Sequence, residues 1–429
     1  MVQRTASGEE RTTVGRFDPF RERNFRLFFG GYAASNIGTA MATVALSFAV
    51  LDSTGSLTDL SLVLAARIVP LVLFLLGGGL LGDRLSRRWV MIISDCVRAV
   101  SQGLVATLFL LGHPPLWTIV TLAAIGGAGE AFFKPSFDGL IPEMVSARRL
   151  PEANALLGLT QSVAMVGGPS IAGVLVAMTS PAVALMVDAS SYLLSIVSLL
   201  CLRINDAPPG PRSSLFGELR DGWKVFGSRP WLWTVTLQFT MFNLVVWAPY
   251  LVLGPASAHA LYGGAGAWGT VLAVYGAGSI LGGLLLLGRR PKRPLVVTTT
   301  ITFLWAAPSA ALAFEMPLVV VCAGALAAGV ANAVFNGLWL TTVQRHVPSE
   351  ALSRVMSYVS FGAYAVGPIG LALAGPLAEA TSIPAVLAVG VGWQLIATSI
   401  VLALPAIRGL TATEDASPAS GTEIADGGA

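Results

Sequence analysis

Twelve apolar runs, each about 20 residues long, are the feature that most constrains how this chain can fold. A helix needs roughly 20 apolar residues to cross the hydrocarbon core of a bilayer. Only 11% of the 429 residues are charged, whereas a typical soluble domain is about 25% charged. The pattern therefore predicts an all-α integral membrane protein with twelve transmembrane helices. The predicted spans are 27–51, 60–82, 89–111, 116–137, 153–178, 182–202, 231–254, 267–288, 295–314, 317–341, 356–377 and 384–406.

The basic residues lie on one side of these spans. Lys and Arg occur in the N-terminal tail (1–26), the even-numbered loops, segment 203–230 and the C-terminal tail (407–429), and the odd-numbered loops contain none. Loops rich in Lys and Arg remain in the cytoplasm. We therefore expect a multi-pass protein of the inner (plasma) membrane with both tails cytoplasmic. Segment 203–230 is then a cytoplasmic linker, and the Gly- and acid-rich C-terminal tail is expected to be disordered.

Short sequence elements recur in the two halves of the chain. Gly78-Gly79-Leu80-Leu81 precedes one basic loop, and Gly282-Gly283-Leu284-Leu285 precedes another. Gly168-Pro169 in the fifth span returns as Gly367-Pro368 in the eleventh. The separations are close to half the chain length, which indicates an internal duplication. We expect two six-helix bundles, residues 27–202 and 231–406, in the parallel-repeat arrangement of a transporter whose halves rock against each other.

The loop between the second and third spans reads Gly79-Leu80-Leu81-Gly82-Asp83-Arg84-Leu85-Ser86-Arg87-Arg88. It resembles the loop signature of the major facilitator superfamily, with Ser86 at the position of the second glycine. The resemblance implies the twelve-helix fold of that superfamily and a gate that latches the halves on the cytoplasmic side. Asp83 would then meet the N-terminus of span eleven, where helix-end N–H groups favour an anion, and Arg87 would reach Asp138. The implied gate residues are Gly79, Asp83, Arg84, Arg87, Arg88 and Asp138.

A second interpretation of this loop is that its arginines only satisfy the positive-inside rule. The fifth span adds to the resemblance, because Gly168-Pro169 followed by Gly173 is similar to an element of the drug-antiporter branch. Glycine permits close helix contact and a proline frees a backbone carbonyl, so a bend is expected there, and a plain packing kink explains the pattern nearly as well. Within the superfamily the chain is most similar to the macrolide-efflux and enterobactin-exporter group.

Six ionisable residues fall inside predicted spans, and all six lie in the first half. Charges in the bilayer are costly, so each needs a partner or a function. Depth along the spans predicts three pairs: Arg98 with Glu130, Asp95 with Lys134, and Arg67 with Asp188.

Two interpretations of these charges remain open. The pairs could be static braces, or one acid could exchange its cation for a proton during transport. Glu130 is the first candidate for proton coupling, because a carboxyl group removed from water takes up a proton more readily. Asp95 and Asp188 follow it.

Polar and aromatic residues at helical spacing predict the wall of a substrate cavity. Apolar walls with a few amides and hydroxyls suit a bulky amphipathic molecule and suit a sugar poorly, because each sugar hydroxyl would need a partner. Ordinary contacts between helices are the alternative. The candidates are Tyr32, Asn36, Thr39, Asn243, Trp247, Asn332, Asn336 and Trp339.

These observations favour a secondary active transporter over an enzyme, since no nucleophile–base set or metal-ligand cluster is visible. Phosphate-loop spacing is absent as well, so no cofactor, metal or nucleic acid is expected. The leading hypothesis is export of an amphipathic antibiotic, secondary metabolite or siderophore by alternating access with proton antiport, and hence a role in drug resistance. The alternatives are a nutrient importer or facilitated-diffusion uniporter of the same superfamily, and a membrane receptor or scaffold without transport.

Overall fold

The structure is a computed structural model that describes residues 17–82, 86–112, 114–204, 223–289, 291–348 and 365–411, with a few single positions between 352 and 362. Its described elements are all helical, as the apolar runs predicted. The first half contains one helix for each of the first six predicted spans. These helices are α1 (Arg23–Thr54), α2 (Leu57–Gly82), α3 (Arg87–Leu111), α4 (Leu116–Met144), α5 (Leu150–Met178) and α6 (Pro181–Leu200).

The second half follows the same plan with two interrupted spans. Span seven consists of α8 (Pro230–Phe242), the π-helical turn η3 (Asn243–Trp247) and α9 (Ala248–Leu261). Span nine consists of α11 (Pro294–Ile301), the 3-10 turn η4 (Thr302–Trp305) and α12 (Ala306–Ala313). The remaining helices are α10 (Ala265–Leu286), α13 (Leu318–His346), α15 (Gly367–Ala380), α16 (Ile383–Ala403) and the short α17 (Pro405–Arg408).

Eleven of these helical stretches are long and apolar enough to cross a membrane in the described part of the chain. The predicted eleventh span, 356–377, is described as α15 and as isolated helical positions before it. The arrangement is therefore consistent with twelve spans. Several helices run beyond the predicted limits; α4, for example, ends at Met144 rather than at 137. Hydropathy marks only the part of a helix that lies in hydrocarbon, whereas the helix itself continues into polar surroundings.

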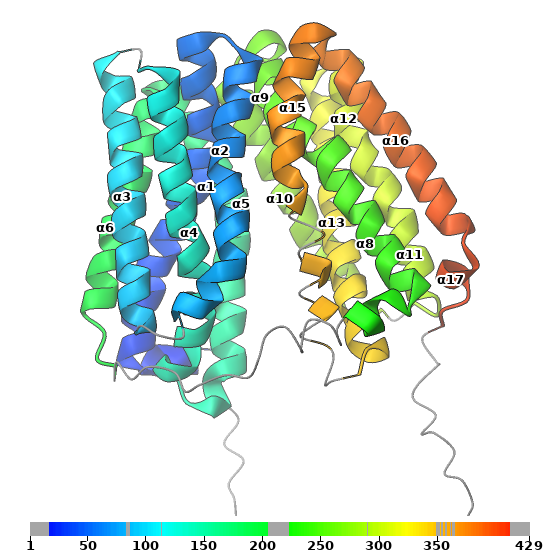
Figure 1. Cartoon of the computed structure of the whole chain (residues 1–429), viewed down its shortest axis with the longest axis horizontal. Coiled ribbons are helices and arrows are strands. Elements are labelled where there is room, and N and C mark those ends of the chain that lie inside the picture. The colour runs from blue at the N-terminus through cyan, green and yellow to red at the C-terminus, as the bar shows by residue number, and fades with distance from the viewer. Residues whose placement is uncertain are drawn as a thin grey trace, which may run out of the picture.

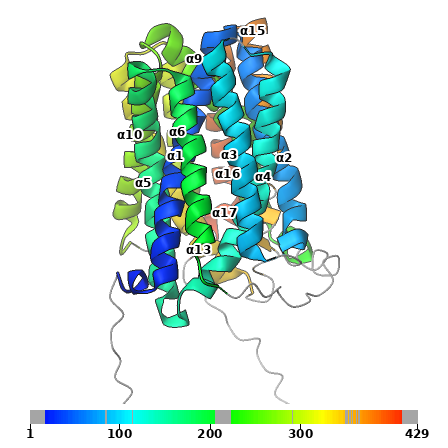
Figure 2. The same ribbon diagram turned by 90° about the vertical axis from the view of Figure 1, so that its left-hand side faces the viewer.

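The two halves stand side by side as separate helical bundles (Figure 1). Asn24 at the start of α1 exchanges two hydrogen bonds with the backbone of Arg203, at 2.9 and 3.1 Å, so the first half begins and ends at the same end of the bundle. We call this end, which also carries Arg87 and Arg289, the basic end. Figure 2 shows α3 and α6 on the outer side of the first half, away from the second half.

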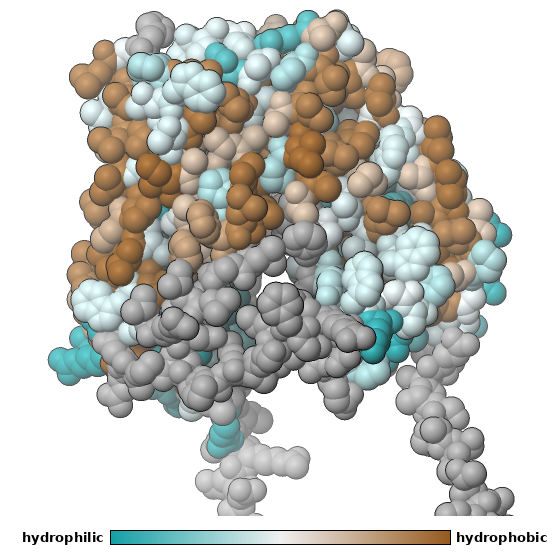
Figure 3. All heavy atoms as spheres, in the orientation of Figure 1, coloured by the Kyte–Doolittle hydropathy of each residue, from teal (hydrophilic) through white to brown (hydrophobic). Residues whose placement is uncertain are grey.

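Apolar side chains cover the outer surface at mid-height, as expected for a surface that faces lipid (Figure 3). Val100 and Leu104 on α3 and Ile396 and Ile400 on α16 are each about half or more exposed. In water such a surface would be an aggregation hazard, but in a bilayer it needs no cover.

Two helix pairs join the halves at the end opposite the basic end. Where α5 crosses α10, an added Cβ at Gly269 would lie 2.5 Å from the carbonyl oxygen of Pro169. Where α2 crosses α15, an added Cβ at Gly375 would lie 2.1 Å from the carbonyl oxygen of Leu57. Glycine therefore sets how closely the backbones approach at both crossings. The helices converge at the top of Figure 1 and diverge toward the basic end at the bottom.

Replacing Gly269 by alanine tests the α5–α10 crossing. The added methyl group meets backbone that cannot turn away, and overpacking of this kind costs roughly 1–3 kcal/mol. We expect the melting temperature of the purified protein to fall. The matched control is Gly266→Ala on the same helix, where an added Cβ meets nothing within 4 Å. Equal melting temperatures for the two variants would contradict the close crossing.

Candidate functional site

A chamber lies between the halves and consists of two adjoining cavities that share Met165. The first cavity is about 410 Å³ in volume and its polar lining comes from the first half. The second is about 280 Å³, and apart from Met165 its lining comes from the second half and includes six aromatic side chains. The chamber thus has one polar, charged wall and one aromatic wall.

The aromatic wall depends on the two interrupted spans. The π-helical turn Asn243–Trp247 brings both Asn243 and Trp247 to the second cavity, and turns of this type often occur at functional sites. The 3-10 turn of span nine ends at Trp305, which packs 4.2 Å from Phe242, centroid to centroid. Tyr250 also lines the cavity, and its buried hydroxyl has no hydrogen-bond partner in the part of the chain that the structure describes.

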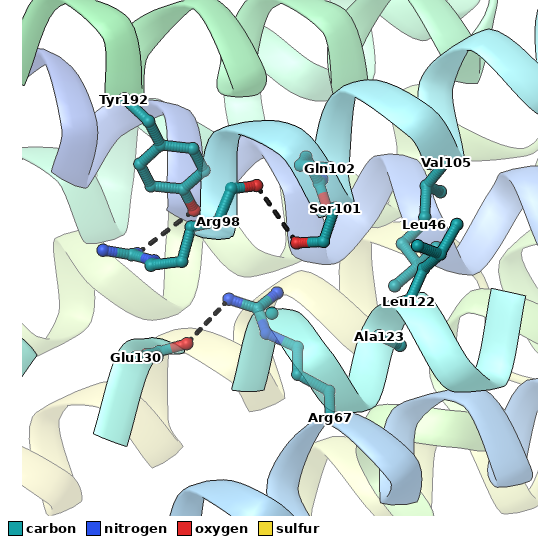
Figure 4. A pocket seen from close by; sticks show the side chains of 11 residues that line it. Leu46, Arg67, Arg98, Ser101, Gln102, Val105, Leu122, Ala123, Glu130 and Tyr192 are labelled. Atoms are coloured by element: carbon teal, nitrogen blue, oxygen red, sulfur yellow. Dashed lines mark hydrogen bonds and ion pairs between the residues drawn. The ribbon is translucent and has the colours of Figure 1, made fainter. Parts of the chain in front are cut away.

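The charged wall is built around an ion pair between α2 and α4. Arg67 Nη2 donates to Glu130 Oε2 at 3.1 Å, and both residues line the first cavity. Figure 4 shows the two side chains meeting below Arg98 and Tyr192. The Glu130 side chain is 30% exposed, so this pair is accessible from the chamber.

Arg98 forms a second, buried centre on α3. Its guanidinium donates to Asp95 Oδ1, to Thr39 Oγ1 and to the Tyr192 hydroxyl, each at 3.1 Å. It also lies 4.2 Å from the centre of the Tyr192 ring, a favourable cation–π position. The Thr39 and Tyr192 oxygens are 3.0 Å apart, and Thr39 reaches the first cavity. The hydroxyl groups therefore connect the buried arginine to the chamber.

The pairs predicted from depth are wrong. Glu130 pairs with Arg67 rather than Arg98, and Asp95 pairs with Arg98, three residues along the same helix, rather than with Lys134. No ion pair to Asp188 is seen within the described residues. Depth along a helix says nothing about the direction in which a side chain points, and that direction depends on how α2, α3 and α4 are rotated against one another.

Six of the eight predicted cavity residues line the chamber. Asn36 and Thr39 lie on the charged side, and Asn243, Trp247, Asn332 and Asn336 lie on the aromatic side. Tyr32 and Trp339 do not. Tyr32 is buried against Phe137, at 4.6 Å between ring centroids, and Trp339 is buried against Trp231. Aromatic residues at helical spacing mark both cavities and cores, so spacing could not separate them.

The structure adds lining residues that the sequence analysis passed over. Gln161 and Met165 of α5, Tyr275 of α10 and Trp305 of span nine all line the chamber. Isolated aromatic residues in apolar spans carry no pattern. The position of Trp305 at the chamber depends on the 3-10 turn that ends at this residue, and the sequence gives no sign of that turn.

In the loop between the second and third spans, Arg87 and Arg88 donate hydrogen bonds to groups of the first half. Arg87 donates to the Gly139 carbonyl at 2.6 Å and to Glu143 at 2.8 Å, so the predicted partner Asp138 is wrong. Asp138 instead interacts with Lys134, one turn earlier on α4. Arg88 donates to the Leu199 and Leu200 carbonyls at the end of α6.

The rest of the predicted gate is described less completely. Asp83 and Arg84 lie outside the described residues, and Gly79 is described only as part of α2. Whether the basic loop latches the halves when the basic end closes therefore stays a prediction.

The predicted element of span five serves helix packing on both sides of α5. An added Cβ at Gly168 would lie 2.4 Å from the Ala40 Cβ on α1, and one at Gly173 would lie 2.9 Å from the Ala265 carbonyl oxygen on α10. Pro169 lies inside α5, which continues through it as a single helix. Gly168 and Gly173 therefore allow close packing on both sides of α5, and a kink at Pro169 stays a prediction.

Polar contacts between the halves, among the described residues, all lie at the end opposite the basic end. Glu379 of α15 accepts hydrogen bonds from the Ser56 hydroxyl, the Thr58 N–H and the Thr58 hydroxyl, at 3.0, 3.0 and 2.6 Å. These groups begin α2, where a carboxylate also complements the helix dipole. Asp52 and His259 approach to 3.6 Å beside this cap. The chamber is therefore closed at this end.

Two six-helix bundles around a chamber that is closed at one end are the architecture of a major facilitator transporter. Comparison with protein families agrees with this class. The family of transmembrane secretion effectors matches residues 14–423, and the chain belongs to that family.

Characterised relatives cover most of the chain. The multidrug efflux pump Tap of Mycolicibacterium fortuitum is 28% identical over 81% of this chain and 87% of its own length. Macrolide efflux protein A of Streptococcus pyogenes is 23% identical over 83% of this chain and 89% of its own. Family and relatives together identify an efflux transporter of the major facilitator superfamily.

Solved structures agree on the fold. The nucleoside transporter NupG superposes with a TM-score of 0.71 at 13% identity, covering 89% of this chain and 98% of its own. A bacterial homologue of the iron transporter ferroportin in an inward-facing state superposes with a TM-score of 0.67 at 18% identity, covering 89% and 98%. At these identities the likeness concerns the fold alone.

Glu379→Gln tests the cap that closes the chamber. The amide keeps the shape but loses the charge that the α2 N-terminus favours, so we expect the halves to separate more often at this end. In a background without Cys96, Cys201 and Cys322, a cysteine introduced by Leu57→Cys should react several-fold faster with a membrane-impermeant maleimide. Glu315→Gln, at the same end but beside Tyr262 of its own half, is the control. Equal rates in both variants would exclude Glu379 from closure.

Proposed function

We propose that this transporter exports bulky amphipathic molecules across the inner membrane by proton antiport. The chamber with one charged and one aromatic wall, closed at the end opposite the basic end, is the observation that carries the proposal. The basic end is the cytoplasmic end by the positive-inside rule. The arrangement is then the one in which a cytoplasmic substrate would load.

The lining of the chamber supports this substrate class. Ring faces of Trp247, Tyr275 and Trp305 offer apolar contact, and the amides of Asn243 and Asn332 offer hydrogen bonds at a few points. A large molecule with scattered polar groups fits such walls. A sugar would leave many hydroxyl groups without partners. The relatives named for multidrug and macrolide efflux suggest the same class.

The proton is proposed as the driving ion because the ionisable groups of the membrane core lie in one cluster next to the chamber. One charge that moves through 100 mV yields about 2.3 kcal/mol, enough for a concentration gradient of roughly fifty-fold at 1.4 kcal/mol per decade. The described charged residues of the second half all lie at helix ends, as Glu315 and Glu379 do. The coupling carboxylate therefore belongs to the first half, where Glu130, Asp95 and Asp188 are the candidates.

Transport into inverted membrane vesicles tests the proposal. A radiolabelled macrolide and ethidium should accumulate when the vesicle interior is acidified, and an uncoupler should abolish the accumulation. Flux that continues unchanged after the uncoupler would instead indicate facilitated diffusion. Absence of any flux, together with no protection in a growth-inhibition panel of chemically distinct toxic compounds, would indicate a protein that does not transport them.

Trp247→Ala tests the aromatic wall. The loss of one ring face, worth about 0.5–1.5 kcal/mol, should raise the substrate concentration for half-maximal transport roughly three- to ten-fold. Trp117→Ala is the control, because Trp117 is 70% exposed at the start of α4 and does not line the chamber. An unchanged half-maximal concentration in Trp247→Ala would remove this wall from substrate binding.

A further inference from the structure

The buried charges of the first half do not balance. The cluster beside the chamber contains two guanidinium groups, Arg67 and Arg98, and three carboxyl groups, Asp95, Glu130 and Asp188. Each guanidinium has one carboxylate in an ion pair, and Asp188 has no ion pair among the described residues. Lys134 does not alter the balance, because it is exposed and interacts with Asp138 as well as with Glu130.

Asp188 is enclosed more completely than an ionised carboxylate tolerates. It is 1% exposed, its Oδ1 atom has no hydrogen-bond partner among the described residues, and the hydrogen-bonding group beside its carboxyl is the Tyr192 hydroxyl. From α1, Gly38 covers it so closely that an added Cβ would lie 2.8 Å from this same oxygen. An unpaired buried charge is expensive, and a group in that position neutralises itself instead.

The ionisable groups that act on Asp188 come from four helices. They are Arg67 on α2, Arg98 on α3, Glu130 on α4 and Tyr192 on its own helix α6. From α1, the described neighbour is Gly38, which carries no charge. With all carboxyl groups ionised the cluster carries a net charge of −1, because three negative charges face two positive ones. One proton makes it neutral.

We infer that Asp188 holds this proton in the present arrangement and is the carboxyl group that couples proton flow to export. The inference rests on the proposed function. It places Asp188 before Glu130 and Asp95 as the proton-coupling residue, because Glu130 forms an ion pair with Arg67 and Asp95 forms one with Arg98. Glu130, in its ion pair with Arg67, then faces the substrate in the chamber. Asp188 is buried next to this pair and carries the proton.

The structure also provides a path for the proton. On release, the O–H bond of Asp188 breaks, and the proton passes by way of the Tyr192 and Thr39 hydroxyls, 3.0 Å apart, to water in the chamber. The carboxylate that remains needs a cation. Arg67 and Arg98 already attract the Asp188 carboxylate electrostatically. Because Gly38 of α1 covers Asp188, a shift of α1 at this residue would allow one of the two guanidinium groups to move closer.

Infrared spectroscopy of the full-length protein in lipid at neutral pH tests where the proton is, without any substrate. A protonated buried carboxyl gives a C=O stretching band, separate from ionised carboxylates, that shifts in D2O. We expect this band in the wild type and its loss in Asp188→Asn. In Asp188→Glu it should persist at a shifted frequency, whereas Asp138→Asn, outside the cluster, should leave it unchanged. A band that persists in Asp188→Asn, or that does not move in Asp188→Glu, overturns the inference.

Transport separates this inference from the proposed function. In vesicles that accumulate the macrolide, Asp188→Asn should reduce the accumulation from roughly fifty-fold to no gradient, while exchange of labelled for unlabelled macrolide continues. Full accumulation by Asp188→Asn rejects Asp188 as the coupling group. If the wild type accumulates nothing in response to a proton gradient, proton antiport fails, whereas the infrared result still decides the protonation of Asp188.

Discussion

The absence of water from the hydrocarbon core is the constraint on which the rest of this structure depends. Every backbone N–H and C=O must find its partner inside its own segment, so each span is a helix. Every charge must be neutralised or reach an aqueous space. The lipid-facing sides of α3 and α16 carry large apolar side chains at mid-height, and Arg67, Arg98 and Glu130 are gathered beside the chamber.

The same constraint explains how the two walls of the chamber differ. In the first half the helices α2, α3 and α4 contribute two ion pairs, with Arg98 as the most fully coordinated member, and α6 adds Tyr192 and Asp188. In the second half, spans seven and nine are interrupted where they meet the chamber, which is where irregular backbone is tolerated in a membrane protein. The result is a charged surface opposite an aromatic one, with a volume between them that suits a large ligand.

Closure of the chamber is achieved by contacts that can also be broken. Glycine lets α5 approach α10 and α2 approach α15 closely, and the Glu379 cap consists of exposed hydrogen bonds. Exposed polar contacts contribute modestly to stability because water competes for them. A pair of rigid bundles joined by such contacts can separate at one end and meet at the other, as alternating access requires.

Local pattern determined much of this protein. The length of the apolar runs predicted the spans, and the arginines on one side of them predicted the topology that we expect. The repeated glycine and proline elements indicated two halves. The asparagines of spans seven and ten and the six ionisable residues were also recognised, because polar groups in apolar runs stand out. Only the tertiary structure decided which side chains are in contact. It pairs Arg67 with Glu130 and Arg87 with Glu143, buries Tyr32 in a core, and leaves Asp188 without an ion pair among the described residues. The reason is that hydropathy and spacing fix depth along a helix, whereas pairing depends on the rotation of each helix about its axis, which is set by packing against its neighbours.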